Sequence, residues 1–238
     1  MIPFLSPGAP FPPVARALRR PNGLLAAGGD LSVETLVRAY AAGIFPWYSE
    51  GDPVLWWSPD PRMVFVTAEF HVSRSLARRL SRGAFRVTMD TAFEAVLEAC
   101  AAPRDEDGGT WLMPEMQAAY VALHERGLAH SVEVWDGEVL AGGLYGVALG
   151  RMFYGESMFS RRTDGSKVAL AWLTAQCVRW GLPLIDCQMS TPHLASLGAR
   201  EVPRRWFTSQ VAMLARQPGP RRWQFDEDLE PAGGRRKE

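Results

Sequence analysis

Two polar side chains interrupt an apolar segment, LIDCQ at residues 184–188, and they are the first candidates for chemistry in this chain. Because side chains alternate across a strand, Asp186 and Gln188 are predicted to share one face and Cys187 the other. An acid and an amide on a core strand cost free energy unless they are paired or in use. Two interpretations follow: a catalytic pair at a strand end, or a buried aspartate bonded to backbone amides.

A polar loop, SRRTDGSK at residues 160–167, is the second candidate. It precedes a helix predicted over 166–180, so backbone N–H groups and cations meet at the helix start, where anions bind well. The polar side chains are those of Arg161, Arg162, Ser166 and Lys167. The alternative is an ordinary helix cap by Asp164 or Ser166.

A helix predicted over 71–82 carries a second group of cations, which are Arg74, Arg78, Arg79 and Arg82. Such a helix is most often a solvated face. It could also follow the phosphates of a nucleic acid, and the two groups of cations together would hold a backbone without reading its sequence.

The elements that must position these residues lie between residues 141 and 188. The pattern predicts strands over 144–149 and 151–159, then the helix over 166–180 and the LIDCQ strand. The first of these strands is rich in glycine, which is typical of a strand that something else approaches closely. Asp136-Gly137 before it predicts a β-hairpin.

The N-terminal region has a different character. Ser32 is predicted to cap a helix that runs to about Ala42, and an aromatic, proline-rich loop follows over 44–62. Trp47 in this loop is a candidate wall for a flat ligand, although such loops more often pack on a core.

These patterns predict an α+β chain in three parts. A small N-terminal module covers 1–62, a larger domain with a mixed central sheet covers 63–225, and 226–238 is predicted to be disordered.

Composition excludes several classes of protein. The 26 Lys and Arg balance 26 Asp and Glu, so overall charge does not indicate nucleic-acid binding, and only local patches could provide it. Three cysteines without a C-x-x-C pair argue against a disulfide framework or a metal site and favour the cytoplasm. No apolar run approaches the ~18 residues that cross a bilayer, and no signal peptide is evident. We expect a cytoplasmic monomer with no membrane segment.

Several segments, in this order and spacing, resemble the leucyl/phenylalanyl-tRNA–protein transferase family over roughly residues 20–207. They are GIFPWYSEGDPVLWWSPDPR, the GTW triplet at 109–111, GGLYGVALGRMFYGESMFS, DGSKVAL, LIDCQ and HLASLGA. Six segments in register are highly specific, whereas any one of them would be weak.

The resemblance implies an activity and a fold. Members of this family move Leu or Phe, and Met to a lesser extent, from tRNA to the N-terminal α-amine of proteins that begin with Arg or Lys. The product is marked for degradation by the N-end rule. The implied fold is a small N-terminal module joined to a domain similar to N-acetyltransferases (GNAT-like). An aminoacyl ester is already activated, so no cofactor is expected.

The resemblance also implies roles for individual residues. Asp186 and Gln188 match the catalytic pair, and Trp47 and Trp111 match aromatics that hold the terminal adenosine of the tRNA. The remaining residues line the aminoacyl pocket or the peptide entrance, and they are Leu144, Phe153, Glu156, Met158, Leu170, Leu173 and Ile185. Leu144, Leu173 and Cys177 stand where relatives can carry larger side chains, which leaves the preference between Leu and Phe open.

From the chemistry of these groups we expect Gln188 to accept a hydrogen bond from the attacking amine through its side-chain oxygen. Asp186 is expected to polarise the NH2 group of Gln188 and to help hold the Arg of the acceptor. An amide is a poor base, so the ribose 2′-OH or water is left to carry the proton.

Three other functions share part of this pattern. An acyl-CoA-dependent N-acetyltransferase would need a [QR]-x-x-G-x-[GA] pyrophosphate motif, which does not follow the GESMFS strand. An RNA-binding module without catalysis does not explain Asp186 and Gln188 in an apolar strand. A peptidoglycan-branching aminoacyl transferase usually has a duplicated fold, for which this chain is too short.

Overall fold

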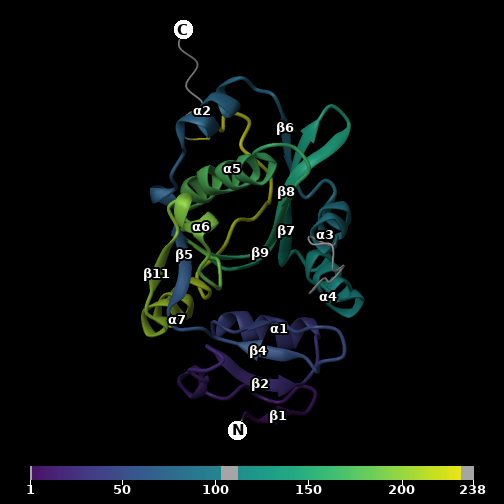
Figure 1. The fold of residues 1–238 in the computed structure, drawn as a ribbon, viewed down its shortest axis with the longest axis vertical. Coiled ribbons are helices and arrows are strands. Elements are labelled where there is room, and N and C mark those ends of the chain that lie inside the picture. The colour runs from purple at the N-terminus through teal and green to yellow at the C-terminus, as the bar shows by residue number, and fades with distance from the viewer. Residues whose placement is uncertain (1, 103–111, 232–238) are drawn as a thin grey trace.

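The computed structural model describes residues 2–102 and 112–231. Within these residues the chain forms a four-stranded and a seven-stranded sheet. Figure 1 shows the smaller sheet at the N-terminal end of the molecule and the larger sheet beside it. The predicted mixture of helices and strands with a separate N-terminal module is confirmed. The boundaries predicted at residues 62 and 225 stay predictions.

The smaller sheet has the strand order β1-β2-β4-β3. Its strands are β1 (Phe4–Leu5), β2 (Leu24–Gly28), β3 (Phe45–Pro46) and β4 (Leu55–Trp57). Helix α1 (Val33–Ala41) packs with this sheet, and the predicted cap is present because the Ser32 hydroxyl accepts a hydrogen bond from the backbone N of Thr35 at 3.3 Å. Tyr40 on α1 is fully buried. Its side chain therefore belongs to the interior between the module and the rest of the protein.

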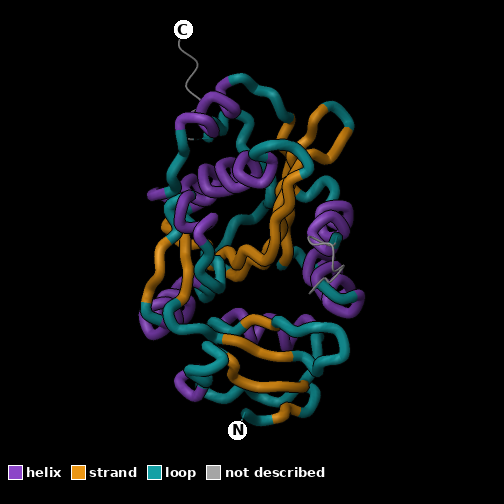
Figure 2. The backbone as a smooth tube through the Cα atoms, viewed as in Figure 1, coloured by secondary structure: helices purple, strands orange, loops and turns teal. Residues whose placement is uncertain are grey.

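The larger sheet has the order β11-β5-β10-β9-β8-β7-β6. Its strands are β5 (Arg62–Val66), β6 (Arg86–Met89), β7 (Ala129–Asp136), β8 (Val139–Leu149), β9 (Met152–Ser160), β10 (Leu184–Asp186) and β11 (Arg200–Val202). Strands β9 and β10 pair in parallel, whereas their other neighbours pair antiparallel, so the predicted mixed sheet is confirmed. Figure 2 shows the long β7–β8 hairpin, whose turn follows Asp136 as the sequence predicts.

Helices cover both faces of this sheet. In Figure 1, α5 lies on one side of β8 while α3 and α4 lie on the other. The helices after α1 are α2 (Arg74–Ser81), α3 (Phe93–Ala101), α4 (Pro114–Glu125), α5 (Gly165–Trp180), α6 (Pro192–Ser196) and α7 (Arg204–Leu214), and short 3-10 turns cover Val14–Arg16 and Thr67–Glu69. Helix α5 is the crossover between the parallel strands β9 and β10, as this kind of connection requires.

Glycines allow β8 to lie close to the start of α5. A Cβ atom on Gly142 would come within 2.7 Å of the backbone of Gly165, a distance that side chains do not tolerate. The close approach that the glycine-rich sequence predicts is therefore present, and it fixes where α5 begins above the sheet.

The segment after residue 225 differs from its prediction up to residue 231. Arg179 on α5 donates to Asp226 at 3.1 Å and to Asp228 at 2.6 Å, and Leu229 is only 5% exposed. Disorder is thus not found in residues 226–231, because ion pairs tie this segment to α5 and Leu229 is buried. The rest of the predicted tail, 232–238, lies outside the described residues.

Candidate active site

A cavity of about 480 Å³ opens between the N-terminal module and the larger sheet. Its walls come from β3 and the residue after it, from β5, β8, β9 and β10, from α5, and from the segment after β10 with the start of α6. The residues predicted to bind substrate that line it are Trp47, Leu144, Phe153, Glu156, Met158, Leu170, Leu173 and Ile185. Trp111 lies outside the described residues. The structure thus gathers residues that span more than 130 positions of the chain around one cavity.

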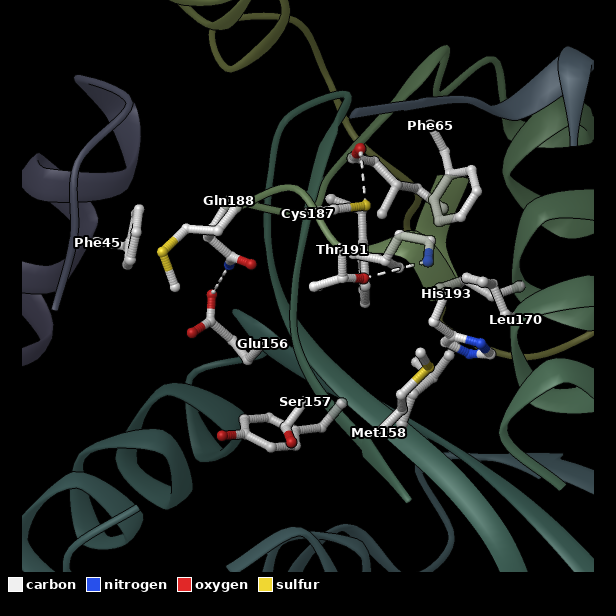
Figure 3. A pocket seen from close by; sticks show the side chains of 18 of the residues that line it. Phe45, Phe65, Glu156, Ser157, Met158, Leu170, Cys187, Gln188, Thr191 and His193 are labelled. Carbon is white, nitrogen blue, oxygen red and sulfur yellow. Dashed lines mark hydrogen bonds between the residues drawn. The ribbon is translucent and has the colours of Figure 1, made fainter. Parts of the chain in front are cut away.

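The cavity has a polar side and an apolar side. Figure 3 shows Gln188 and Glu156 facing each other on one side, and Phe65, Leu170 and Met158 on the other. Phe65 is not among the predicted residues, because a phenylalanine in an apolar strand gives no signal that separates a pocket wall from the core. An apolar end beside one amide–carboxylate pair suits a ligand with an apolar tail and a polar reactive group.

Gln188 reaches the cavity because the backbone departs from a strand. Strand β10 ends at Asp186, and Gln188 has a φ of +55°, in the left-handed region. The predicted face is therefore wrong for Gln188, which lies with Ile185 and Cys187 rather than with Asp186. Ile185, Cys187 and Gln188 all line the cavity, whereas Asp186 is completely buried away from it. This conformation costs free energy for any residue other than glycine, and such strained residues are most common at functional sites.

Asp186 has a different partner from the predicted one. Its Oδ1 accepts from Arg62 Nε at 2.7 Å and from the backbone N of Gln188 at 3.0 Å, and its Oδ2 accepts from Arg62 Nη2 at 2.6 Å. The side-chain NH2 of Gln188 is not among these donors. The prediction that Asp186 polarises this NH2 group is therefore wrong. The prediction that Asp186 helps to hold the Arg of an acceptor is also wrong, because neither side chain of the Arg62–Asp186 ion pair has exposed surface.

Arg62 is the residue that the sequence patterns did not single out. Its guanidinium lies between the rings of Phe45 and Phe207, 4.7 Å and 4.6 Å from their centroids, and it also donates to the Gly43 carbonyl at 3.3 Å. An arginine that opens the apolar strand RMVFV was the available signal, because arginine is almost never fully buried unless it is paired. It joins the N-terminal module to the strand that carries Asp186.

Glu156 holds the side chain of Gln188. Gln188 Nε2 donates to Glu156 Oε1 at 3.1 Å, the dashed line in Figure 3, and Tyr120 donates to Glu156 Oε2 at 2.6 Å. The pairing of β8 with β9 passes from Tyr145–Ser157 to Gly146–Gly155, so Glu156 is the extra residue of a β-bulge. Bulges redirect side chains next to active sites. Burial raises the pKa of Glu156 to about 7.

Two further side chains in the cavity wall carry reactive groups. Cys187 lines the cavity together with Ile185, as the predicted alternation requires, and burial raises the pKa of its thiol well above the usual range. It is therefore a thiol rather than a thiolate. His193 also lines the cavity, and Figure 3 shows it on the side away from Gln188 and Glu156. Thr191 provides the cap of α6.

The predicted anion site before α5 is partly occupied by the chain itself. The Asp164 carboxylate lies 2.9 Å from Lys167 and 3.8 Å from Arg79, and Arg162 pairs with Asp136 at 3.3 Å. Asp164 stands at the predicted N-cap position, but its side chain makes no capping hydrogen bond; Ser160 Oγ instead accepts from the backbone N of Ser166 at 2.8 Å. The cations that none of these pairs includes are Arg74, Arg78, Arg82 and Arg161, all of which are exposed. Figure 1 places α2 at the end of the molecule away from the smaller sheet.

Trp47 is placed where an aromatic ligand could reach it. Its side chain is 39% exposed at the edge of the cavity, and its ring meets Trp57 edge-on at 5.6 Å between centroids. Trp57 Nε1 donates to the Trp47 carbonyl at 2.6 Å. The ring is thus supported from behind while one part of its surface stays open.

A second polar cluster lies outside the cavity. The ligand atoms of Asp90, His124 and His130 lie within 4.8 Å of one another. Asp90 has a φ of +55°, lies 2.7 Å from His130 Nδ1 and accepts from the backbone N of Ser131. These hydrogen bonds explain the position of Asp90 without a cap or an ion, and Ala92 stands at the start of α3.

Two family models match this chain, one before residue 62 and one after it. A family model described as "leucyl/phenylalanyl-tRNA protein transferase" matches residues 64–212, and one described as its N-terminal domain matches 29–60. A protein named leucyl/phenylalanyl-tRNA–protein transferase from Alkalilimnicola ehrlichii is 58% identical over 231 residues, which cover 95% of this chain and 88% of the relative. Its namesake from Nitrosomonas europaea is 56% identical over 227 residues, 95% of this chain and 96% of the relative.

One solved structure, that of L-PGS from Bacillus licheniformis, covers 70% of this chain and 53% of its own with 10% identity and a TM-score of 0.37. A score this low carries no argument about fold. The N-acetyltransferase-like assignment of the larger domain therefore stays a prediction.

No helix within residues 2–102 and 112–231 is long and apolar enough to cross a membrane.

Proposed function

The chain belongs to the leucyl/phenylalanyl-tRNA protein transferase family and is a transferase, and on that premise we propose that it moves Leu or Phe from aminoacyl-tRNA to the N-terminal α-amine of proteins beginning with Arg or Lys. Met is transferred to a lesser extent, and the product is marked for degradation by the N-end rule. The reaction takes place in the cytoplasm, needs no cofactor, and is carried out by a monomer.

The observation that carries this proposal is the two-sided cavity. An aminoacyl ester has an apolar side chain next to a reactive carbonyl, and the cavity offers Leu170 and Met158 on one side and Gln188 on the other. A volume of about 480 Å³ has room for Leu or Phe together with part of the ribose. Apolar walls separate side chains that differ by a methylene by only ~1–3 kcal/mol, which accounts for some Met transfer.

The geometry supports a refined role for Gln188. Its NH2 group is held by Glu156, so the side-chain oxygen of the same amide is the group left to accept a hydrogen bond from the attacking amine. Asp186 accepts from the backbone N of Gln188 and thereby fixes the unusual conformation of this residue. Asp186 is then a positioning residue, while Gln188 contacts the substrate. Alignment of amine and ester can remove several kcal/mol of the barrier.

The tRNA is held by its 3′ end and its acceptor stem. Trp47 at the cavity edge suits stacking with the terminal adenosine, and Trp111 is proposed as its partner on the resemblance alone. A base stacked on an aromatic side chain gains roughly 1–3 kcal/mol. The exposed cations of α2, with Arg161, suit the phosphates of the stem and carry no sequence information.

Transfer of radiolabelled Leu tests the proposal directly. Labelled Leu-tRNA is offered with a protein that begins with Arg and with the same protein beginning with Ala, and acetyl-CoA with a labelled acetyl group is offered separately as the alternative donor. Label on the Arg protein alone, and only from tRNA, is the expected result. Label from acetyl-CoA alone would move the chain to the acetyltransferases, and no label from either donor would mean that the cavity is not used for transfer.

A further inference from the structure

The proposed transfer assigns one proton to no group of the protein, and the sequence alone left it to the ribose 2′-OH or to water. A neutral amine that attacks the ester brings an N–H proton, and the departing ribose oxygen must receive one. Gln188 is an amide and is too weak a base for this purpose. We propose that the Glu156 carboxylate takes the proton from the attacking amine and returns it to the departing oxygen, and that Tyr120 and Tyr40 are positioning residues behind it. This inference rests on the proposed function.

The position of Glu156 is the first argument. Its carboxylate lines the cavity and lies 3.1 Å from the nitrogen of Gln188, the residue proposed to orient the amine. An amine that donates a hydrogen bond to the side-chain oxygen of Gln188 would therefore lie close to the Glu156 carboxylate. Glu156 is the unpaired residue of the β-bulge, and the bulge turns its side chain toward the cavity. In an unbroken strand Glu156 would pair with a residue of β8.

The tyrosines form the second argument. Tyr120 donates to Glu156 Oε2 at 2.6 Å, and the Tyr40 hydroxyl lies 3.1 Å from that of Tyr120. Because the proton of Tyr120 points to the carboxylate, Tyr40 is the donor in the second bond. Both rings are fully buried, Tyr40 on α1 and Tyr120 on α4. Two helices from distant parts of the chain thus hold one carboxylate.

The surroundings of Glu156 suit a group that exchanges a proton at neutral pH. Burial raises the pKa of the carboxyl to about 7, while the Tyr120 hydroxyl that donates to it, with Tyr40 behind, acts to lower it. The charged groups that face it are Asp186, which raises the pKa, and Arg62, which lowers it. A general base is most effective when its pKa lies near the working pH.

The step balances without any further reactant. The amine nitrogen forms a bond to the ester carbon, and Glu156 accepts the N–H proton. The bond between this carbon and the ribose oxygen then breaks, and Glu156 returns the proton to that oxygen. The products are a peptide bond, a tRNA with a free hydroxyl, and Glu156 as the carboxylate with which the cycle began.

Other side chains in or near the cavity are less suited to the role. Asp186 is buried in its ion pair with Arg62 and has no exposed surface. Burial keeps Cys187 a thiol, because the pKa of this group is raised. Figure 3 shows His193 on the apolar side, across the cavity from Gln188.

Two variants and one control test the inference. Glu156→Gln keeps the shape and can still accept from Gln188, but it cannot take a proton. Tyr120→Phe removes the hydroxyl that lowers the pKa of Glu156. Tyr154→Phe is the control, because Tyr154 is equally buried and packs on Tyr40, while its hydroxyl makes no hydrogen bond within the described residues. Single-turnover transfer from Phe-tRNA to an Arg peptide is followed from pH 6 to pH 9, with tRNA binding measured separately.

Glu156→Gln is expected to lower the rate at pH 7 by about 10²–10³-fold with tRNA binding unchanged. Tyr120→Phe is expected to move the acid limb of the profile to higher pH, with a loss of about tenfold at low pH for each unit of the move and recovery near pH 9. Tyr154→Phe is expected to follow the wild type.

If wild-type protein transfers Phe and Glu156→Gln does so at a similar rate, Glu156 only positions Gln188 and the inference is overturned. An unmoved acid limb in Tyr120→Phe would overturn the role of the tyrosine. Wild-type protein that binds tRNA but transfers nothing would overturn the proposed function itself, and this inference with it.

Discussion

Arg62 and Asp186 form a bidentate ion pair in which neither side chain has any surface exposed to solvent. Asp186 stands at the end of β10 beside the cavity, while Arg62 lies between Phe45 of the N-terminal module and Phe207 of α7. One residue thus links three parts of the chain to the segment that carries Gln188. The pair makes the shape of the site depend on how the two sheets are joined.

Replacing Arg62 by Leu is expected to destabilise the protein by roughly 3–5 kcal/mol, because Asp186 would be left buried and unpaired. Chemical unfolding by urea at pH 7 measures this change. Arg126→Ala is the control, since Arg126 and its partner Glu34 are both exposed, and no measurable change is expected. If the double variant with Asp186→Leu is no more stable than Arg62→Leu alone, the unpaired charge is not the cause of the loss.

Asp186→Ala is expected to lower the single-turnover rate strongly and to leave tRNA binding almost unchanged. The backbone N of Gln188 loses its acceptor, so the left-handed conformation that directs the amide into the cavity is no longer held. Asp186→Asn, which keeps an oxygen for this bond, is the comparison and should lose less. Rates are measured below the unfolding temperature of each variant, and an unchanged rate in Asp186→Ala would remove Asp186 from the mechanism.

The sequence predicted what depends on local patterns. The Ser32 cap, the helix after Gly165 and the hairpin after Asp136 follow from short-range rules and are present. The residues that line the cavity were predicted from the resemblance to the family. The geometry of the polar side could not be predicted, because it depends on the positive φ of Gln188 and on the bulge at Glu156, both of which depend on tertiary contacts.

Those two irregularities changed the interpretation of the site. In an unbroken strand Asp186 would lie on the same face as Gln188 and could hold its amide, which is what alternation predicts. The structure instead pairs Asp186 with Arg62, 124 residues away in the chain, and gives the amide to Glu156. A contact between residues so far apart leaves no signal in the spacing of a single sequence.

Leu173→Ala is expected to raise the ratio of kcat/KM for Phe over that for Leu. Leu173 lines the cavity, and removing its branched end leaves room that the larger Phe side chain fills better. One methylene in an apolar pocket is worth ~1–3 kcal/mol, so a change of about tenfold or more in the ratio is expected. Leu97→Ala is the control, because this leucine is as buried but lies away from the cavity. Equal ratios in the two variants would show that Leu173 does not contact the aminoacyl group.

Affinity for tRNA is expected to fall as salt is raised, and the exposed arginines of α2 are expected to carry part of this dependence. Replacing Arg74 and Arg78 together by Gln should reduce the slope of log K against log salt by about 1 for each phosphate that the variant no longer neutralises. Arg126→Gln, at the end of α4, serves as the comparison. A slope that is the same in all three proteins would place the acceptor stem on another surface.

Glu156 is expected to make the protein less stable as pH rises from about 4.5 to 7. Its carboxyl has a pKa of about 7 in the folded protein against 4.5 for an ordinary glutamate, because burial disfavours the charged form. In this interval the folded state binds more protons than the unfolded state, so the free energy of unfolding falls with pH and is lowest above 7. The full effect is about 3 kcal/mol at most.

Glu156→Gln removes the titrating group, so its stability relative to the wild type is expected to be greater at pH 8 than at pH 5. Urea unfolding at the two pH values measures the difference, and it needs no tRNA. Glu34→Gln is the matched control, because this glutamate is exposed on α1. If the stability of Glu156→Gln relative to the wild type is the same at both pH values, the Glu156 carboxyl is ionised throughout. The proton carrier of the transfer would then be neither Glu156 nor Gln188.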